Sequence, residues 1–421
     1  MLTWLRWGLS RDATLLIAGQ GLRAAGYGFT AVILGVLLAD RGYTPLQAGV
    51  VLTALIAGTA VASLVAARLA DRVGLRRSYG WFFLAMAAAG AIVAIGAPFW
   101  VLLVIALTGT LSTDVVDNGP AATLEQVMLA AEDAGTAIVY GRYNAVGAAA
   151  GALGALAAAL PGLGQHGDSG IPAWLFAVLI PIGLTGALLA WRLSPAVETT
   201  SAGALPGLIQ TVRASSRLGP SRPVVRQLAT LFAVDAAGGG LVTTGFLAYF
   251  FSQRYGVSIA ALGWLFFSVS IVQAVSVMLA PRLARRFGLI ATMVGTHLPS
   301  NLLLIAVAFA PNFPIAAALM LARTTLSQMD VPTRQALVMT VVTPGERTTA
   351  AAVTNASRYV VRPIGPLVAG AVQQLALGAP LVLAGLIKAG YDLALWHWAH
   401  HLPRLSVEPD TTHNDPATEE S

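Results

Sequence analysis

The sequence predicts an all-α membrane protein of twelve transmembrane helices, arranged as two pseudo-symmetric six-helix bundles. Three observations predict this fold. Of the 421 residues, 56% are hydrophobic and only 10% are charged, whereas soluble globular domains carry about 25% charged residues. Apolar runs long enough to cross a bilayer recur along the chain, with arginines in alternate connections between them. A short motif from the first half also returns in the second half.

The apolar runs set the predicted spans, because a helix needs roughly 20 residues to cross a hydrocarbon core about 30 Å thick. They cover residues 12–38, 46–66, 79–97, 100–120, 138–160, 172–192, 226–250, 259–280, 289–310, 314–332, 348–373 and 380–400. Residues 1–192 form the predicted first bundle and 226–400 the second. Residues 193–225, rich in Pro, Ser, Thr, Gly and Arg, form a linker, and the polar tail 401–421 is expected to be disordered.

The distribution of arginine sets the predicted orientation, since short cytoplasmic connections retain positive charge. One set of connections holds Arg68, Arg72, Arg76, Arg77, Arg213, Arg217, Arg222, Arg282, Arg285, Arg286, Arg334 and Arg347. The opposite set holds Arg41 and Arg254. Both termini are therefore predicted to be cytoplasmic, in a protein of the inner (cell) membrane. The net charge of +6 is not clustered as a nucleic-acid-binding surface requires.

An internal repeat supports two related halves. The string Ala-Arg-Leu-Ala-Asp-Arg-Val-Gly-Leu at 67–75 returns at 281–289 as Pro-Arg-Leu-Ala-Arg-Arg-Phe-Gly-Leu, a shift of 214 residues that Gly42 and Gly256 share. Two parallel repeats of this kind place a solute site at their interface, near the bilayer midplane.

The connection between spans 2 and 3 reads Asp71-Arg72-x-Gly74-x-Arg76-Arg77. With two six-helix halves and a basic linker, this motif resembles the major facilitator superfamily over essentially the whole chain. The family's motif begins with Gly where this chain has Ala67. The resemblance implies that Asp71 docks near the start of span 11 and that Arg72 and Arg76 bridge to span 4, as a cytoplasmic gate completed by Gly74 and Arg77. The alternative is that these arginines only enforce topology.

Span 4 holds the candidates for proton coupling. An ionisable residue inside a span is costly and is a functional candidate by default. Asp114 and Asp117 share a helix face, and Glu125 follows a Gly-Pro break. Neighbouring carboxylates favour retention of a proton near neutral pH. Alternatively, span 4 ends early, and Asp117 and Glu125 are solvated acids that pair with Arg72 or Arg76.

Spans 1, 7 and 11 hold the candidates for a solute cavity. Arg23 lies halfway along span 1 with Gln20 one turn earlier, and Asp235 occupies nearly the same place in span 7. Arg23 and Asp235 are expected to face each other across one cavity, together with Arg362. They would attract a charged solute or pair with each other when it is empty. A purely structural bridge is the alternative.

Further polar groups in the second half are weaker candidates. Lys388, with Tyr391 and Asp392 nearby, suits either a structural pair or a coupling site, and Asn301 suits an interhelical hydrogen bond. The three histidines His397, His400 and His401 fit an interfacial belt better than a metal site.

The expected function is secondary transport of a small solute by a functional monomer in the lipid bilayer. Proton-coupled export of an amphipathic compound, by antiport, is the first hypothesis, and proton-coupled uptake of an anionic or zwitterionic metabolite is the alternative. A non-transporting membrane sensor or scaffold is a third. The chain has no cysteine, and its sequence contains no motif for an enzyme, a metal or a cofactor.

Overall fold

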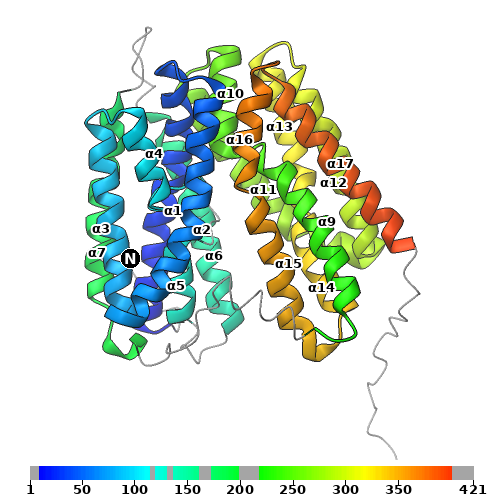
Figure 1. Ribbon diagram of the computed structural model, residues 1–421, viewed down its shortest axis with the longest axis horizontal. Helices are drawn as coiled ribbons and strands as arrows, with labels where there is room; N and C mark the ends of the chain where they lie inside the picture. Colours follow the sequence, from blue (N-terminus) through cyan, green and yellow to red (C-terminus); the bar gives the residue numbers. More distant parts are fainter. Residues whose placement is uncertain (1–8, 114–118, 130–135, 161–171, 199–217, 401–421) are drawn as a thin grey trace, which may run out of the picture.

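The computed structural model describes residues 9–113, 119–129, 136–160, 172–198 and 218–400, and in this part of the chain the regular elements are all helical. The first bundle contains α1 (Arg11–Asp40), α2 (Pro45–Val73), α3 (Leu75–Ala94), α4 (Phe99–Leu107), α5 (Pro120–Leu129), α6 (Thr136–Ala157) and α7 (Leu179–Trp191). The second contains α9 (Arg222–Gly240), α10 (Thr244–Tyr255), α11 (Ile259–Phe287), α12 (Leu289–Ala308), α13 (Phe313–Ser327), α14 (Asp330–Val341), α15 (Arg347–Val361), α16 (Ile364–Gln373) and α17 (Ala379–His400). Short 3₁₀ turns flank these helices at Ala173–Val178, Pro195–Glu198 and Pro344–Glu346. The two bundles stand side by side (Figure 1).

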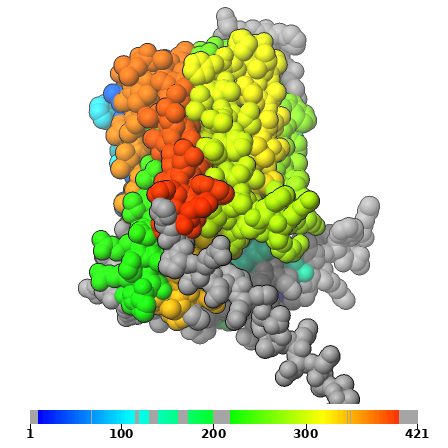
Figure 2. All heavy atoms as spheres, turned by 90° about the vertical axis from the view of Figure 1, so that its right-hand side faces the viewer, coloured from blue at the N-terminus to red at the C-terminus, as the bar shows by residue number. Residues whose placement is uncertain are grey.

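These helices make the twelve predicted passes. Eight helical stretches of the described chain are long and apolar enough to cross a membrane, including α9 with α10 and the 3₁₀ turn with α7. The other four passes are α6 and the pairs α4–α5, α13–α14 and α15–α16. Figure 2 shows the face of the second bundle that turns away from the first, with α17 in its middle. Large apolar side chains on α12 and α17 are exposed: Leu302 is 58% exposed, Leu386 59% and Leu393 58%. Such a surface suits lipid rather than water.

Several passes are broken rather than continuous. Thr243 caps α10 and so starts a new helix after α9, and Pro363 separates α15 from α16. These two breaks lie against each other, because a Cβ on Gly240 would lie 3.0 Å from Cα of Gly365. The second bundle therefore has, in adjacent spans 7 and 11, a common level at which backbone hydrogen bonding is interrupted.

The connections between spans 2 and 3 and between spans 8 and 9 are shorter than predicted. Between the predicted spans 46–66 and 79–97 almost the whole connection is helical, because α2 continues to Val73 and α3 begins at Leu75. Gly74 alone joins them with φ +94°, and Gly288, 214 residues later, joins α11 to α12 with φ +88°. Only glycine adopts this backbone readily. The shared geometry supports the internal repeat.

In the part of the chain that the structure describes, the two bundles contact each other at one end. We call the end with the arginines of α2, α3 and α11 the basic end, and the opposite one the far end. At the far end Tyr249 of α10 donates to the carbonyl of Tyr43 (2.9 Å), and Gln253 donates to the carbonyl of Ala39 (3.2 Å). Small residues allow close approach there, since a Cβ on Gly35 would lie 2.8 Å from Ala248 Cβ of α10. α2 likewise packs on α16, and α6 on α11.

The apolar cores follow the same division. One core runs through the first bundle and continues into the far end of the second, through residues such as Phe246, Phe250 and Leu262. A separate core at the basic end of the second bundle includes Val225, Phe232, Met293 and Leu395. Among the described residues, the bundles are thus joined at the far end and diverge towards the basic end (Figure 1).

Candidate functional site

Two groups of buried polar side chains lie inside the bundles. The N cluster consists of Gln20, Arg23, Tyr79, Glu125 and Tyr143, and all five come from the first bundle. The C cluster, in the second bundle, consists of Asp235, His297, Asn301, Asp330, Arg334, Arg358, Lys388 and Asp392. Burying so many ionisable groups is costly unless they are paired.

The N cluster is built around Glu125 of α5. Its carboxylate accepts hydrogen bonds from Tyr79 of α3 (2.6 Å) and Tyr143 of α6 (2.6 Å), and pairs with Nη2 of Arg23 (2.9 Å). Gln20, one turn before Arg23 on α1, also accepts from that Nη2. Four helices therefore meet at one carboxylate.

The structure closes the N cluster from solvent on all sides. Arg23 and Glu125 are both 0% exposed. The Arg23 guanidinium lies 5.4 Å from the ring centre of Tyr27, and its Nε and Nη1 have no hydrogen-bond partner in the described chain. The interpretation of Glu125 as a solvated acid paired with Arg72 or Arg76 is therefore wrong, since Glu125 is enclosed and pairs with Arg23.

The C cluster is built around Asp235 of α9. Lys388 of α17 donates to its carboxylate, and the guanidinium groups of Arg334 and Arg358 lie 3.6 and 3.7 Å from its Oδ2. Nε2 of His297 lies 3.8 Å from Oδ1. One carboxylate thus faces cationic side chains from three helices, α14, α15 and α17, and a histidine from a fourth, α12.

A histidine and a second carboxylate extend the C cluster. Nδ1 of His297 lies 2.7 Å from Oδ1 of Asp392, and the amide of Asn301 donates to Oδ2 of Asp392 (2.8 Å). The His297 ring also meets the ring of Tyr391 edge to face. His297, 2% exposed, therefore lies between two carboxylates, Asp392 and Asp235.

The C cluster contains three carboxylates, Asp235, Asp330 and Asp392, and three cations, Arg334, Arg358 and Lys388. A fourth cation, Arg323 of α13, lies within reach of the charge on Asp235. The Nε atoms of Arg323 and Arg358 have no hydrogen-bond partner among the described residues. The Arg358 side chain is also 29% exposed, the largest value among the ion-paired groups. A cationic group with spare donors thus reaches the edge of the cluster.

The structure places the predicted cavity residues in different surroundings. Arg23 and Gln20 belong to the N cluster and Asp235 to the C cluster, so Arg23 and Asp235 do not pair with each other. Arg362 lies at the break between α15 and α16, partly buried, near Arg358. Asp114 and Asp117 lie outside the described residues.

The predicted gate residues lie at the basic end. Asp71, Arg72 and Arg77 are exposed. Arg76 donates to the carbonyl of Leu193 after α7 (3.0 Å), and Glu198 accepts from the backbone N–H groups of Leu75 and Arg76 at the start of α3 (2.7 and 3.1 Å). This places the gate motif against the beginning of the linker; its contacts with spans 4 and 11 stay a prediction.

Sequence reasoning missed two members of the C cluster and misplaced a third. His297 and Asp330 were not singled out as site residues, although both are ionisable groups inside spans. Arg334 was assigned to a cytoplasmic connection, and this is wrong: it is 5% exposed within α14 and pairs with Asp330 (2.6 Å). The pair lies one turn apart on one helix, a spacing that the sequence displays.

Known proteins share this architecture. The nucleoside transporter NupG superposes with a TM-score of 0.72 over 92% of this chain and 98% of its own, at 14% identity. A bacterial homolog of the human lysosomal transporter Spinster, inward-facing and unoccupied, gives 0.67 over 92% and 95%, at 15% identity. An uncharacterized membrane protein of Saccharomyces cerevisiae, YJR124C, is 25% identical over 86% of this chain and 88% of its own.

The sequence model of the Major Facilitator Superfamily matches residues 16–366, most of the chain. That match agrees with the twelve passes, the two related bundles and the solved transporters of the same fold. The chain therefore belongs to the major facilitator superfamily, as a multi-pass membrane transporter and not an enzyme.

Proposed function

We propose that the protein is a proton-coupled secondary transporter of a small anionic solute, with the C cluster as its binding and coupling site. The observation that carries the proposal is that three cations share the single carboxylate of Asp235, while the Nε atoms of Arg323 and Arg358 have no hydrogen-bond partner among the described residues. A guanidinium presents its N–H groups as a planar fork that matches a carboxylate or phosphate. An anionic group is therefore the ligand that completes the cluster.

The position of Arg358 supports access from the space between the bundles. Arg358 belongs to α15, and Figure 1 shows this helix on the side of the second bundle that faces the first. Its helix continues as α16, which packs on α2 of the first bundle. The other cations of the cluster, Arg334 and Lys388, are almost fully buried. A solute that enters between the bundles would meet Arg358 first.

The geometry of Asp235 and His297 supports the proposed coupling to protons. A bound anion competes with Asp235 for Arg358 and Arg334, and the Asp235 carboxylate is then less well neutralised. A proton on Nε2 of His297 restores the balance, since that atom lies 3.8 Å from Asp235 while Nδ1 faces Asp392. The charged groups in contact with this histidine are Asp235 and Asp392. Lys388, Arg334 and Arg358 reach it through their pairs with Asp235, and Asp330 pairs with Arg334. Anion and proton would thus bind together.

Alternating access supplies the transport cycle. The bundles are joined at the far end and diverge at the basic end. Basic connections favour the cytoplasmic side, so this conformation would be open to the cytoplasm. Both termini would lie on the cytoplasmic side of an inner membrane, and the monomer would be the working unit. Asp71, Arg72 and Arg76 would close the basic end in the opposite state.

Flux measurements in proteoliposomes test the proposal. A panel of small carboxylates, phosphates, amines and neutral amphipathic compounds is added while an internal dye reports pH, for the wild type and for Arg358→Gln and Arg323→Gln. We expect anion flux with a solute-dependent pH change, and loss of most of that flux in both variants. Arg282→Gln, which removes an exposed arginine at the basic end, serves as the control and should transport normally.

The same assay separates the competing hypotheses. Uptake driven by an inward proton gradient indicates symport, and export driven by that gradient indicates antiport. Flux of neutral amphipathic compounds that survives Arg358→Gln would reject the anion site and restore the first sequence hypothesis. The proton dependence of anion flux in two variants locates the coupling site. If flux still depends on protons in His297→Gln but no longer does in the double variant Asp114→Asn with Asp117→Asn, then coupling takes place in span 4.

A further inference from the structure

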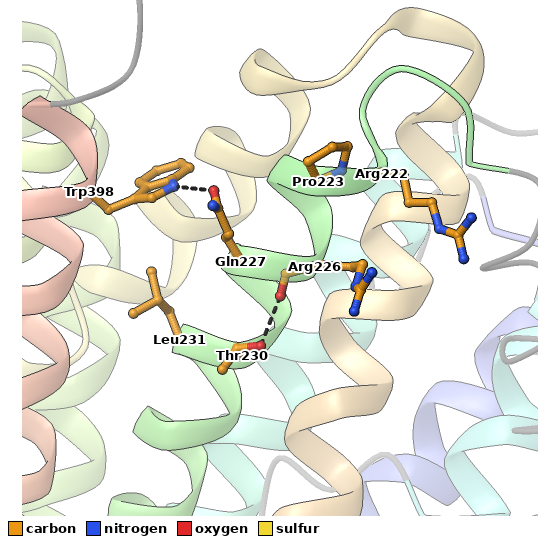
Figure 3. A pocket seen from close by; sticks show the side chains of 7 residues that line it. All are labelled: Arg222, Pro223, Arg226, Gln227, Thr230, Leu231 and Trp398. Atoms are coloured by element: carbon orange, nitrogen blue, oxygen red, sulfur yellow. Dashed lines mark hydrogen bonds between the residues drawn. The ribbon is translucent and has the colours of Figure 1, made fainter.

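A shallow cavity lies outside both clusters, at the basic end of the second bundle. Its volume is about 790 Å³, and it extends across the outer face of α9 towards the end of α17. The lining residues are Arg222, Pro223, Arg226, Gln227, Thr230, Leu231 and Trp398. Figure 3 shows the two arginines on one side of α9, and Gln227, Leu231 and Trp398 on the other.

The polar side of this cavity is cationic. Arg222 and Arg226 are four residues apart and so share a helix face. Both are exposed, no acid lines the cavity, and neither forms an ion pair within the described part of the chain. Both lie in the first turns of α9, where positive charge opposes the helix dipole and does not stabilise the helix. Their charge is therefore available to an anionic ligand.

The other side of the cavity is apolar and fixed. The indole N–H of Trp398 donates to Oε1 of Gln227 (2.8 Å), which holds the ring at the end of α17. Leu231 lies nine residues after Arg222, about 14 Å deeper along the helix at about 1.5 Å per residue. Tryptophan gathers at the level of lipid headgroups. The cavity thus has positive charge at the start of α9 and apolar groups deeper along the helix. A phospholipid has the matching order, with a charged headgroup at the surface and acyl chains below it.

We propose that this cavity binds the headgroup of an anionic phospholipid of the surrounding leaflet. The phosphate would lie against Arg222 and Arg226, and the upper acyl chains would pass over Leu231 and Trp398. A volume of about 790 Å³ corresponds to roughly 26 water molecules at about 30 Å³ each, so a free inorganic ion would leave most of the cavity to solvent. Basic pockets beside transmembrane helices on the cytoplasmic side are the sites where anionic headgroups bind.

The experiment counts bound lipid by native mass spectrometry while the purified full-length protein is titrated with phosphatidylglycerol or phosphatidylcholine. Wild type should retain phosphatidylglycerol in preference to phosphatidylcholine. The double variant Arg222→Gln with Arg226→Gln should weaken phosphatidylglycerol binding roughly 30-fold, because each arginine near an anionic membrane surface contributes roughly a five-fold factor.

Matched variants separate this site from general charge. Arg282→Gln with Arg286→Gln removes two exposed arginines four residues apart at the same basic end, and should leave binding unchanged. Arg222→Lys with Arg226→Lys keeps the charge and should retain most of the binding, which also guards against misfolding of the glutamine variant. Equal binding in both glutamine pairs would overturn the proposal.

Two further arms distinguish other occupants. Inorganic phosphate at the same concentration should not displace the lipid, and complete displacement would identify a site for soluble anions instead. Residues 401–421 carry five acidic residues and one arginine and follow α17 directly. A chain that ends at His400 should bind phosphatidylglycerol as the full-length chain does. Binding that appears only after this removal would show that the acidic segment, not lipid, occupies the cavity.

Discussion

The ion pair between Arg23 and Glu125 gives a prediction whose size follows from its surroundings. Glu125→Gln keeps the shape of the side chain but leaves the Arg23 guanidinium in a site that is 0% exposed. Removal of one partner of a buried pair costs about 3–5 kcal/mol, because the other charge is left uncompensated. Arg23→Met leaves Glu125 with the hydroxyls of Tyr79 and Tyr143 only, so its cost should lie near the lower end of that range.

The double variant Arg23→Met with Glu125→Gln should be much less harmful than the two single changes suggest. No buried charge remains, and the glutamine carbonyl still accepts from one tyrosine. The other tyrosine hydroxyl is left without its acceptor, which costs about 1–3 kcal/mol. Single costs of about 4 and about 3 kcal/mol, less about 2 kcal/mol for the double variant, give an expected coupling energy of about 5 kcal/mol in favour of the pair.

The cycle is measured as free energy of unfolding in mixed micelles titrated with a denaturing detergent, followed by tryptophan fluorescence. Arg282→Met, at an exposed position, should change stability by less than about 0.5 kcal/mol. If the two single effects add within about 0.5 kcal/mol, as independent sites do, then the pair is not energetically coupled and the description of the N cluster as a single unit fails.

Three further predictions concern other regions. Gly35→Ala would push a Cβ into the backbone of α10, so it should lower transport and weaken the contact between the bundles at the far end, which chemical labelling of residues at that end would detect as increased accessibility. Gly295→Ala is the control, because a Cβ there meets nothing within 4 Å and should change neither property. The hydrogen bond from the Ser221 side chain, then those from neighbouring groups, lower the pKa of Glu346 from 4.5 to about 2. Its contribution is thus present above about pH 4.5 and is lost as pH falls towards 2, so melting temperatures of wild type and Glu346→Gln should differ at pH 6 and converge at low pH. Glu198→Gln should cost about 1–3 kcal/mol of unfolding free energy, because it weakens the charged cap at the start of α3; an unchanged value would mean that the linker does not support this helix.

Much of the fold could be predicted, because the sequence patterns that specify it have direct physical causes. Apolar length and arginine placement predict passes through a bilayer, and the repeat at 214 residues predicts related halves. The matching φ angles of Gly42 and Gly256, +69° and +59°, and of Gly74 and Gly288 agree with that repeat. Helix ends were less predictable. Charged residues at 68–77 look like a loop by composition, yet they lie on helices that extend beyond the apolar core, where arginine side chains reach water.

The candidate site was only partly predictable. The sequence identifies Arg23 and Asp235 as costly charges inside spans and Glu125 as a coupling candidate just beyond span 4, but it does not reveal which charges meet. Arg23 is 102 positions from Glu125, and Asp235 is 153 positions from Lys388. Such distances carry no pairing signal in a single sequence. Arg334 was misplaced because an arginine near a predicted span end has two physically reasonable positions, a connection or a buried ion pair.

Spans 7 and 11 are interrupted next to each other, so the second bundle should bend more easily at that level than elsewhere. On the far-end side of the interruptions, α10 and α16 pack on the first bundle. On the basic-end side, α9 and α15 carry Asp235 and Arg358. Bending a continuous helix stretches its backbone hydrogen bonds, but at the interruptions in spans 7 and 11 some of these hydrogen bonds are already missing. The softest deformation therefore cuts across spans 7 and 11 instead of separating the bundles as rigid blocks. An occluded intermediate could then form by the swing of two half-helices while the far-end seal stays intact.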